Sequence, residues 1–157
     1  MGIGRYPHTD FMLDGSDMTT IEKAERLHKR VNTFMLSCNG ADGYPMTKAV
    51  VPGKYRESLR ELYFCTNTSS KFAAQVSQNP KGNVYYYKRI LFNFKGCLLK
   101  GDFEIVSDMG IKEKHWQWIF KDAYPQKSFT DPDFCVLKFT PISGRFYADF
   151  KIEDFNL

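Results

Sequence analysis

The sequence lacks the segments that mark membrane-spanning and exported proteins, and it is poor in cysteine. No run of 18 apolar residues and no signal peptide is found in its 157 residues, so we expect no membrane partner and a cytoplasmic protein. Cys38, Cys65, Cys97 and Cys135 each lie in an apolar stretch, and no two have the C-x-x-C spacing of a zinc site. We therefore expect four reduced, buried thiols and no metal site.

Blocks of like charge and catalytic motifs are missing as well. The net charge is only +4, which argues against a nucleic-acid partner and suits a small anionic ligand. No P-loop, H-E-x-x-H or G-x-S-x-G motif is present. His8, His28 and His115 lie far apart in the sequence, and the last two fall on predicted helices, where a solvated or hydrogen-bonded histidine is far commoner than a ligand. The catalytic residues therefore stay unknown at this level.

Apolar and aromatic residues are plentiful, at 43% and 16% of the chain, which is typical of a globular domain. We expect one domain over residues 1–157, with residues 1–17 forming an N-terminal arm. Thr19 and Glu22 have the spacing of a capping box, and apolar residues at helical intervals then predict a helix that reaches Val31.

The rest of the chain is dominated by strand patterns joined by short loops. Strands are predicted at 33–38, 45–51, 59–66, 84–87, 92–106, 134–139 and 144–150, and two more helices at 70–78 and 108–120. Gly101 interrupts the alternation of the longest strand, which indicates a bend or bulge. This order predicts a mainly β (α+β) domain whose antiparallel sheet is closed or nearly closed into a barrel. A Rossmann fold is not expected, because neither G-x-G-x-x-G nor regular βαβ alternation occurs.

The stretch from Leu62 to Lys71 is the strongest candidate for a binding site. An apolar strand ends there in hydroxyl residues, and a helix begins at once. The first turn of a helix has free N–H groups and a partial positive charge, so Ser69, Ser70 and Lys71 could bind a phosphate. Ser and Thr are also favoured as ordinary helix caps, which is the alternative explanation.

The order of motifs resembles the pyridoxamine 5′-phosphate oxidase-like family of FMN-binding split barrels, and in particular its short general-stress-protein-like members. The matching segments are Tyr44–Val50, Phe64–Thr68, Ser69–Lys71, Asn79–Pro80, Gly96–Val106, Tyr124–Pro125 and Asp131–Phe134. The resemblance implies an antiparallel split β-barrel of about six strands, Greek-key-like, with flanking helices. It also implies a homodimer with FMN at its two-fold interface.

The resemblance further implies which residues hold the cofactor. Ser69, Ser70 and Lys71 would bind the FMN phosphate, and Cys65 and Thr66 would lie beside the cofactor at the strand end. Lys48 stands where the family usually has an arginine that contacts the flavin, and Ala49 and Val50 would run their backbone past the isoalloxazine ring. A lysine is a compact ammonium and cannot reproduce the planar fork of arginine.

These features predict an FMN-dependent oxidoreductase that passes electrons from a nicotinamide or another donor to a small acceptor. Oxidation of vitamin B6 itself is not expected, because the sequence lacks the Arg-rich C-terminal segment of true pyridoxamine phosphate oxidases. Two alternatives remain: a flavin-binding store or sensor without turnover, and a protein that binds haem or another planar cofactor on the same fold. Trp116 and Trp118 are expected in core or dimer contacts.

Overall fold

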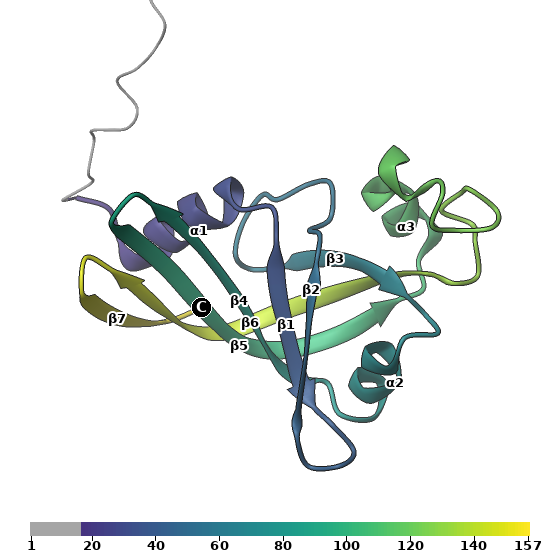
Figure 1. The fold of residues 1–157 in the computed structure, drawn as a ribbon, viewed down its shortest axis with the longest axis horizontal. Coiled ribbons are helices and arrows are strands. Elements are labelled where there is room, and N and C mark those ends of the chain that lie inside the picture. The colour runs from purple at the N-terminus through teal and green to yellow at the C-terminus, as the bar shows by residue number, and fades with distance from the viewer. Residues whose placement is uncertain (1–16) are drawn as a thin grey trace, which may run out of the picture.

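The computed structural model describes residues 17–157, which form a strongly curved antiparallel sheet with helices at its ends (Figure 1). The predicted N-terminal arm lies almost wholly outside these residues. In chain order the elements are α1 (Thr20–Arg30), β1 (Phe34–Asn39), β2 (Pro45–Val50), β3 (Leu62–Asn67), α2 (Lys71–Gln78), β4 (Lys81–Ile90), β5 (Asn93–Val106), α3 (Met109–His115), the 3-10 turn η1 (Trp118–Phe120), β6 (Phe134–Ala148) and β7 (Lys151–Asn156).

The sheet is a barrel that stays open along one seam. Its strand order is β2-β1-β4-β5-β6-β3, and every pair is antiparallel. Outside this path, β7 pairs with residues 143–148 of β6. The two outer strands of that path, β2 and β3, come together beside one isolated bridge between Pro52 and Phe64. This topology confirms the predicted mainly β fold with a split-barrel architecture.

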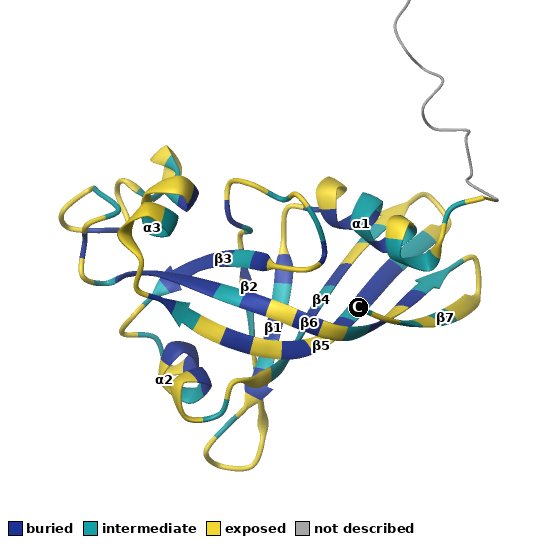
Figure 2. Cartoon of the chain, turned by 180° about the vertical axis from the view of Figure 1, so that it is seen from behind, coloured by how far each residue is buried: buried dark blue, intermediate teal, exposed yellow. Residues whose placement is uncertain are grey.

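Two apolar clusters hold the elements together. The larger one fills the barrel and is built around the fully buried rings of Phe34, Phe64 and Tyr86. The smaller one lies between α3, η1 and the ends of β3 and β6, where Trp116 packs edge-on against Phe134. Along β5 from Cys97 and along β6 after Leu137 buried and more exposed residues largely alternate, as expected for strands that cover a core on one face (Figure 2). The first four residues of β6 are all buried.

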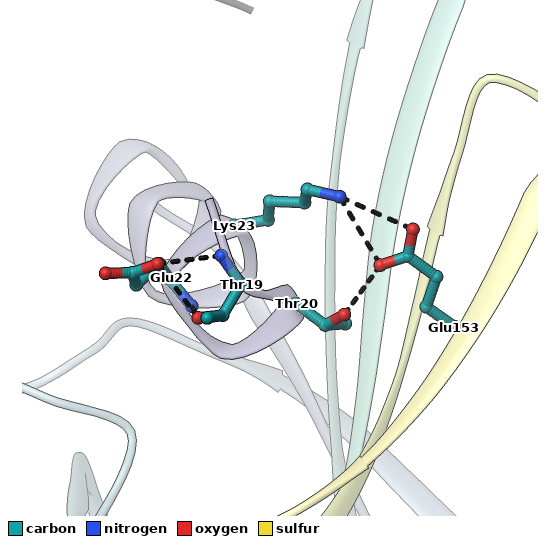
Figure 3. A network of polar contacts seen from close by, with 5 residues as sticks. All are labelled: Thr19, Thr20, Glu22, Lys23 and Glu153. Carbon is teal, nitrogen blue, oxygen red and sulfur yellow. Dashed lines mark hydrogen bonds and ion pairs between the residues drawn. The ribbon is translucent and has the colours of Figure 1, made fainter. Parts of the chain in front are cut away.

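Helix α1 is fastened to the sheet by a small polar network. Its predicted capping box is present, with Thr19 and Glu22 bonding reciprocally. The next residues reach β7: Thr20 donates to Glu153 at 2.6 Å, and Lys23 forms an ion pair with the same carboxylate at 3.4 Å (Figure 3). These contacts join the first described helix to the last strand.

The structure differs from the predicted elements at the C-terminal end. The two strands expected at 134–139 and 144–150 are one continuous strand, β6, and β7 was not predicted. Pro141 is tolerated inside β6 because it lies opposite Gly101 at a register shift, where the ladder is already interrupted. The helix expected at 108–120 ends at His115, since Trp116 adopts an extended backbone, and a 3-10 turn follows.

Candidate functional site

The seam between β2 and β3 brings two of the predicted residues together. The alternation along β2 leaves Ala49 exposed and turns Lys48 and Val50 to the inner side. The ammonium of Lys48 crosses the seam and donates to Thr66 Oγ1 at 2.5 Å. Since β2 and β3 lack a hydrogen-bonded ladder here, this side-chain bond is a main polar link between the two edges. Lys48 is therefore not an ordinary solvated strand lysine.

Burial changes the chemistry of the seam. Desolvation lowers the pKa of Lys48 below its usual range, and the nearby Cys135 opposes that shift. Cys135 faces Thr66 in the β3–β6 register and is itself buried. Burial raises the pKa of its thiol, while the cations Lys112 and Lys48 lower it. Thr66 is 5% exposed, and its carbonyl accepts a 2.9 Å hydrogen bond from Tyr124 Oη. The polar groups of Thr66 at the seam are thus buried and hydrogen-bonded.

The loop after β3 is clamped by a carboxylate that sequence analysis did not assign. Asp133 accepts from the Ser69 N–H and from Asn67 Nδ2, both at 2.8 Å, and its carbonyl accepts the Thr68 N–H. These donors hold the pKa of Asp133 below its usual value. The adjacent Asp131 is 2% exposed and bonds two backbone N–H groups of its own loop. The Asp-Pro-Asp sequence is the signal for this arrangement, because Asp favours such local backbone bonds.

Ser70 has the role of helix cap that the alternative explanation gives it. Its Oγ accepts the Ala73 N–H at 3.1 Å, and its own N–H bonds to the Asn67 carbonyl. A capping hydroxyl still has a proton to donate, and the first helical N–H groups, those of Lys71 and Phe72, lie where a helix has no internal acceptors. Lys71 is exposed at the same helix start. The helix terminus can therefore accept an anion, although the Asp133 carboxylate stands close to it.

Two predicted residues point away from this region. Cys65 alternates with Thr66 along β3, so its side chain enters the second apolar cluster, where Sγ lies 3.6 Å from the His115 carbonyl. Burial raises the pKa of that thiol to about 12. Val50 is 8% exposed and belongs to the barrel core. Only the backbone of these two residues could line a cofactor groove.

The outer face of the sheet carries an aromatic row. Ala49 lies opposite Met35, which lies opposite Tyr85 on the next strand. From there, rings follow one another at centroid distances of 5.5–6.1 Å, in the order Tyr85, Tyr87, Phe94 and Tyr147. We name Met35, Tyr85, Tyr87, Phe94, Leu98 and Tyr147 the aromatic face. An outward sheet face is usually polar, so this composition indicates a covered surface. The signal in the sequence is the alternation that points Tyr85 and Tyr87 the same way.

Other predicted features lie elsewhere. A cavity of about 130 Å³ opens beside His115, Tyr55 and Tyr63, under α3 rather than at the seam. Trp116 packs in the second cluster as expected, whereas Trp118 is 83% exposed. Within residues 17–157, no three His, Cys, Asp or Glu side chains gather as metal ligands would. No helix in that part of the chain is long and apolar enough to cross a bilayer.

Comparison with known proteins agrees with the fold. The family model described as pyridoxamine 5′-phosphate oxidase like matches residues 19–152. A Clostridium acetobutylicum protein related to general stress protein 26 of B. subtilis, ascribed to the pyridoxinephosphate oxidase family, has 30% sequence identity and a TM-score of 0.75 over 86% of this chain and 92% of its own. This chain therefore belongs to the pyridoxamine 5′-phosphate oxidase-like family.

More distant structures share the fold. A Nostoc punctiforme protein, described as pyridoxamine 5′-phosphate oxidase-related and FMN binding, has 16% identity and a TM-score of 0.63, with 89% of this chain and 98% of its own covered. A haem-binding protein of Mycobacterium smegmatis has 13% identity and a TM-score of 0.71, with 88% and 58% covered. No curated protein matches the sequence. The fold thus occurs in proteins described as binding either FMN or haem.

Proposed function

We propose that this protein binds FMN and acts as a flavin-dependent oxidoreductase on a small substrate, as a homodimer. The observation that carries the proposal is the position of Lys48. Its partly desolvated ammonium lies at the open seam of the barrel, and one loop separates β3 at that seam from the capped start of α2. In a family that includes a protein described as FMN binding, these are the charges and hydroxyls that a phosphorylated planar cofactor requires.

The residues present fit the cofactor in most respects. Ser70 and Lys71 at the start of α2 would hold the phosphate, since a hydroxyl and an ammonium both donate to phosphate oxygens. Lys48 would offer its ammonium to the flavin in place of the family's arginine, and the backbone of Ala49 and Val50 would lie along the ring. Asp133 opposes the phosphate and is the main feature against this fit. Bound FMN would supply the electron-transfer chemistry itself, so the chain needs only to hold and orient it.

The aromatic face supports the homodimer. It begins beside Ala49, a candidate cofactor residue, and continues across β4, β5 and β6. A second copy packed on this face would cover apolar rings that otherwise contact water, and it would enclose the exposed surface next to Ala49. A specific dimer of this kind should bury on the order of 2,000 Å² in total.

Two other functions would use the same region of the fold. A flavin-binding store or sensor would have the same fold and would bind FMN without turnover, and steady-state reduction by NAD(P)H separates it from an enzyme. Haem is favoured only by the fold that the chain shares with the mycobacterial protein. Histidine is a common iron ligand, but both described histidines, His28 and His115, are only 2% exposed, so neither is placed to bind the iron of a haem. The visible spectrum of the purified protein distinguishes flavin from haem.

A paired titration tests the phosphate site. We expect Lys71→Ala to weaken FMN binding by about 1.5–3 kcal/mol, the usual value for a hydrogen bond to a charged group. Riboflavin lacks the phosphate, so it should bind weakly to the wild type and equally to the variant. Each ligand is titrated by flavin fluorescence, with circular dichroism as the check on folding.

Asp133→Asn is the matched control, because it should change FMN affinity in the opposite direction. Asparagine keeps an acceptor for the Ser69 N–H but removes the negative charge. FMN should then bind more tightly, while riboflavin binding stays unchanged. Equal FMN affinity in wild type, Lys71→Ala and Asp133→Asn would show that the phosphate lies elsewhere and that Ser70 is only a helix cap.

A further inference from the structure

Two tight hairpin turns lie side by side at the end of the molecule away from α3. The first joins β4 to β5 with Ile90 opposite Asn93, and the second joins β6 to β7 with Ala148 opposite Lys151. Lys95 lies opposite Ala148, so the two turns leave the sheet at the same end, two strands apart (Figure 1). Strands are about 4.8 Å apart, which separates the turns by about 10 Å.

Both turns present large apolar side chains to water. Leu91, Phe92 and Phe150 are 83%, 96% and 93% exposed, and Ile90 adds a fourth, partly exposed side chain. Scattered exposed apolar residues are common, but a group of four on two neighbouring turns indicates an interaction surface.

The backbone conformation at these turns indicates that Leu91 and Phe150 do not stabilise the fold. Leu91 has φ 52° and Phe150 has φ 62°, both in the left-handed region. Tight hairpins place Gly or Asn at such positions, because a larger side chain is strained there. Leucine and phenylalanine therefore destabilise these turns slightly, and an intermolecular contact would explain their presence.

The surroundings of the turns are basic. Lys88, Arg89 and Lys95 flank the first turn and Lys151 follows the second, whereas Asp149 is the one carboxylate within the two turns. Within residues 17–157, none of these four cations forms an ion pair. We name these cations, together with Ile90, Leu91, Phe92 and Phe150, the basic–apolar edge. Two copies of this edge facing one another would repel, so a self-complementary contact through it is disfavoured.

We propose that the basic–apolar edge docks the protein on an anionic lipid surface. Leucine and phenylalanine enter the boundary between headgroups and acyl chains, and lysine and arginine bind the lipid phosphates and carboxylates. No membrane partner was expected from the sequence because it has no long apolar segment, and turns this short leave no such signal. The proposal is independent of the cofactor.

Vesicle sedimentation of the 157-residue chain without FMN tests the proposal. The wild type should sediment with phosphatidylcholine vesicles that contain phosphatidylserine, and much less with pure phosphatidylcholine. Added salt should release it, and replacing Lys88 or Lys95 by Gln should lower the partition coefficient about fivefold each.

The double variant Leu91→Asn, Phe150→Asn separates docking from folding. Asparagine adopts left-handed φ with less strain, so the melting temperature should hold or rise. Vesicle binding should fall at least about tenfold, the loss expected from removing two apolar anchors. Trp118→Asn is the matched control, because Trp118 is as exposed as Leu91 but follows α3 at the other end of the molecule.

Three results would overturn the proposal. The wild type fails to sediment with the anionic vesicles at low salt, the double variant binds as well as the wild type, or Trp118→Asn loses binding to the same degree. A wild type that ignores vesicles, combined with a double variant whose mass by light scattering is reduced, would assign the edge to contacts between copies instead.

Discussion

Among the individual residues, His28 shows how far the fold alters a side chain's chemistry. It lies on the same face of α1 as Ala24 and Leu27, and it packs edge-on against the rings of Phe34 and Tyr86. Its Nδ1 is buried without a partner. Burial, with the charges of Arg56 and Lys29, lowers the pKa of His28 to about 4. The expectation of a solvated or hydrogen-bonded helix histidine is not met at Nδ1, because helical spacing places it among core residues.

This pKa predicts a specific loss of stability in acid. An unfolded histidine titrates near pH 6.5 and the folded His28 near 4, so protons bind preferentially to the unfolded chain. The contribution of neutral His28 to the free energy of unfolding is therefore complete above pH 6.5. It declines as the pH falls toward 4, by about 3 kcal/mol in total. His28→Leu removes the titrating group and the unpartnered Nδ1. Urea unfolding at pH 7 and pH 4 should show a smaller acid loss in the variant.

The comparison isolates His28 from other groups. His115, whose pKa is also lowered to about 4, and the carboxylates titrate in both proteins, so their effects cancel. If wild type and His28→Leu lose equal stability between the two pH values, His28 is not held neutral by the fold.

At the scale of elements, the pairing of β5 with β6 depends on Gly101. The register shifts between Lys100 and Gly101, where Gly101 lies opposite Pro141. A Cβ added to Gly101 would lie 2.2 Å from the Thr140 carbonyl oxygen and 2.7 Å from Pro141 Cα. Both are backbone atoms, so neither can move aside without disturbing the long hairpin. The bulge that sequence analysis expected at Gly101 is confirmed.

We expect Gly101→Ala to destabilise the protein by about 2–4 kcal/mol, as overpacking against fixed atoms does. Gly110→Ala is the matched control. Its added Cβ would meet only the Asp108 side chain, at 3.2 Å, and alanine favours the helix that contains it. Thermal unfolding of both variants measures the difference. A Gly101→Ala protein as stable as Gly110→Ala would mean that the bulge can rearrange at little cost.

At the scale of the whole molecule, the aromatic face should control assembly. Tyr87 is 48% exposed near the centre of that face and stacks on both Tyr85 and Phe94. If a second copy packs there, Tyr87→Glu buries an unpaired charge and should dissociate the dimer. Light scattering at micromolar concentration should give twice the 18.3 kDa chain mass for the wild type and the single chain mass for the variant.

Ala123→Glu serves as the control for a general effect of added charge, since Ala123 is exposed in the loop after η1 rather than on the aromatic face. It should leave the dimer intact. A wild-type monomer that binds FMN tightly would contradict a cofactor site shared between two copies.

Local signals in the sequence determined most elements of this protein. Capping residues at Thr19 and Ser70, alternation along the strands and the turn before Pro45 are short-range properties, and each acts on its neighbours wherever the chain lies. The helix starts, most strands and the near-closed antiparallel barrel therefore followed from the sequence, and the order of motifs led to the family.

Only the tertiary structure decided which side chains meet. Lys48 and Thr66 are separated by 18 positions, and Asp133 reaches Ser69 across 64, so no local pattern reports either contact. The same limit applies to Cys65: alternation along β3 shows only that it and Thr66 face opposite sides, and the tertiary structure decides that its side chain enters the second cluster. It also explains why β6 runs through Pro141: the proline is compatible with the strand only because Gly101 of β5 lies opposite it. Local preferences determine where each element forms, whereas closure of the barrel determines which residues of other elements it contacts.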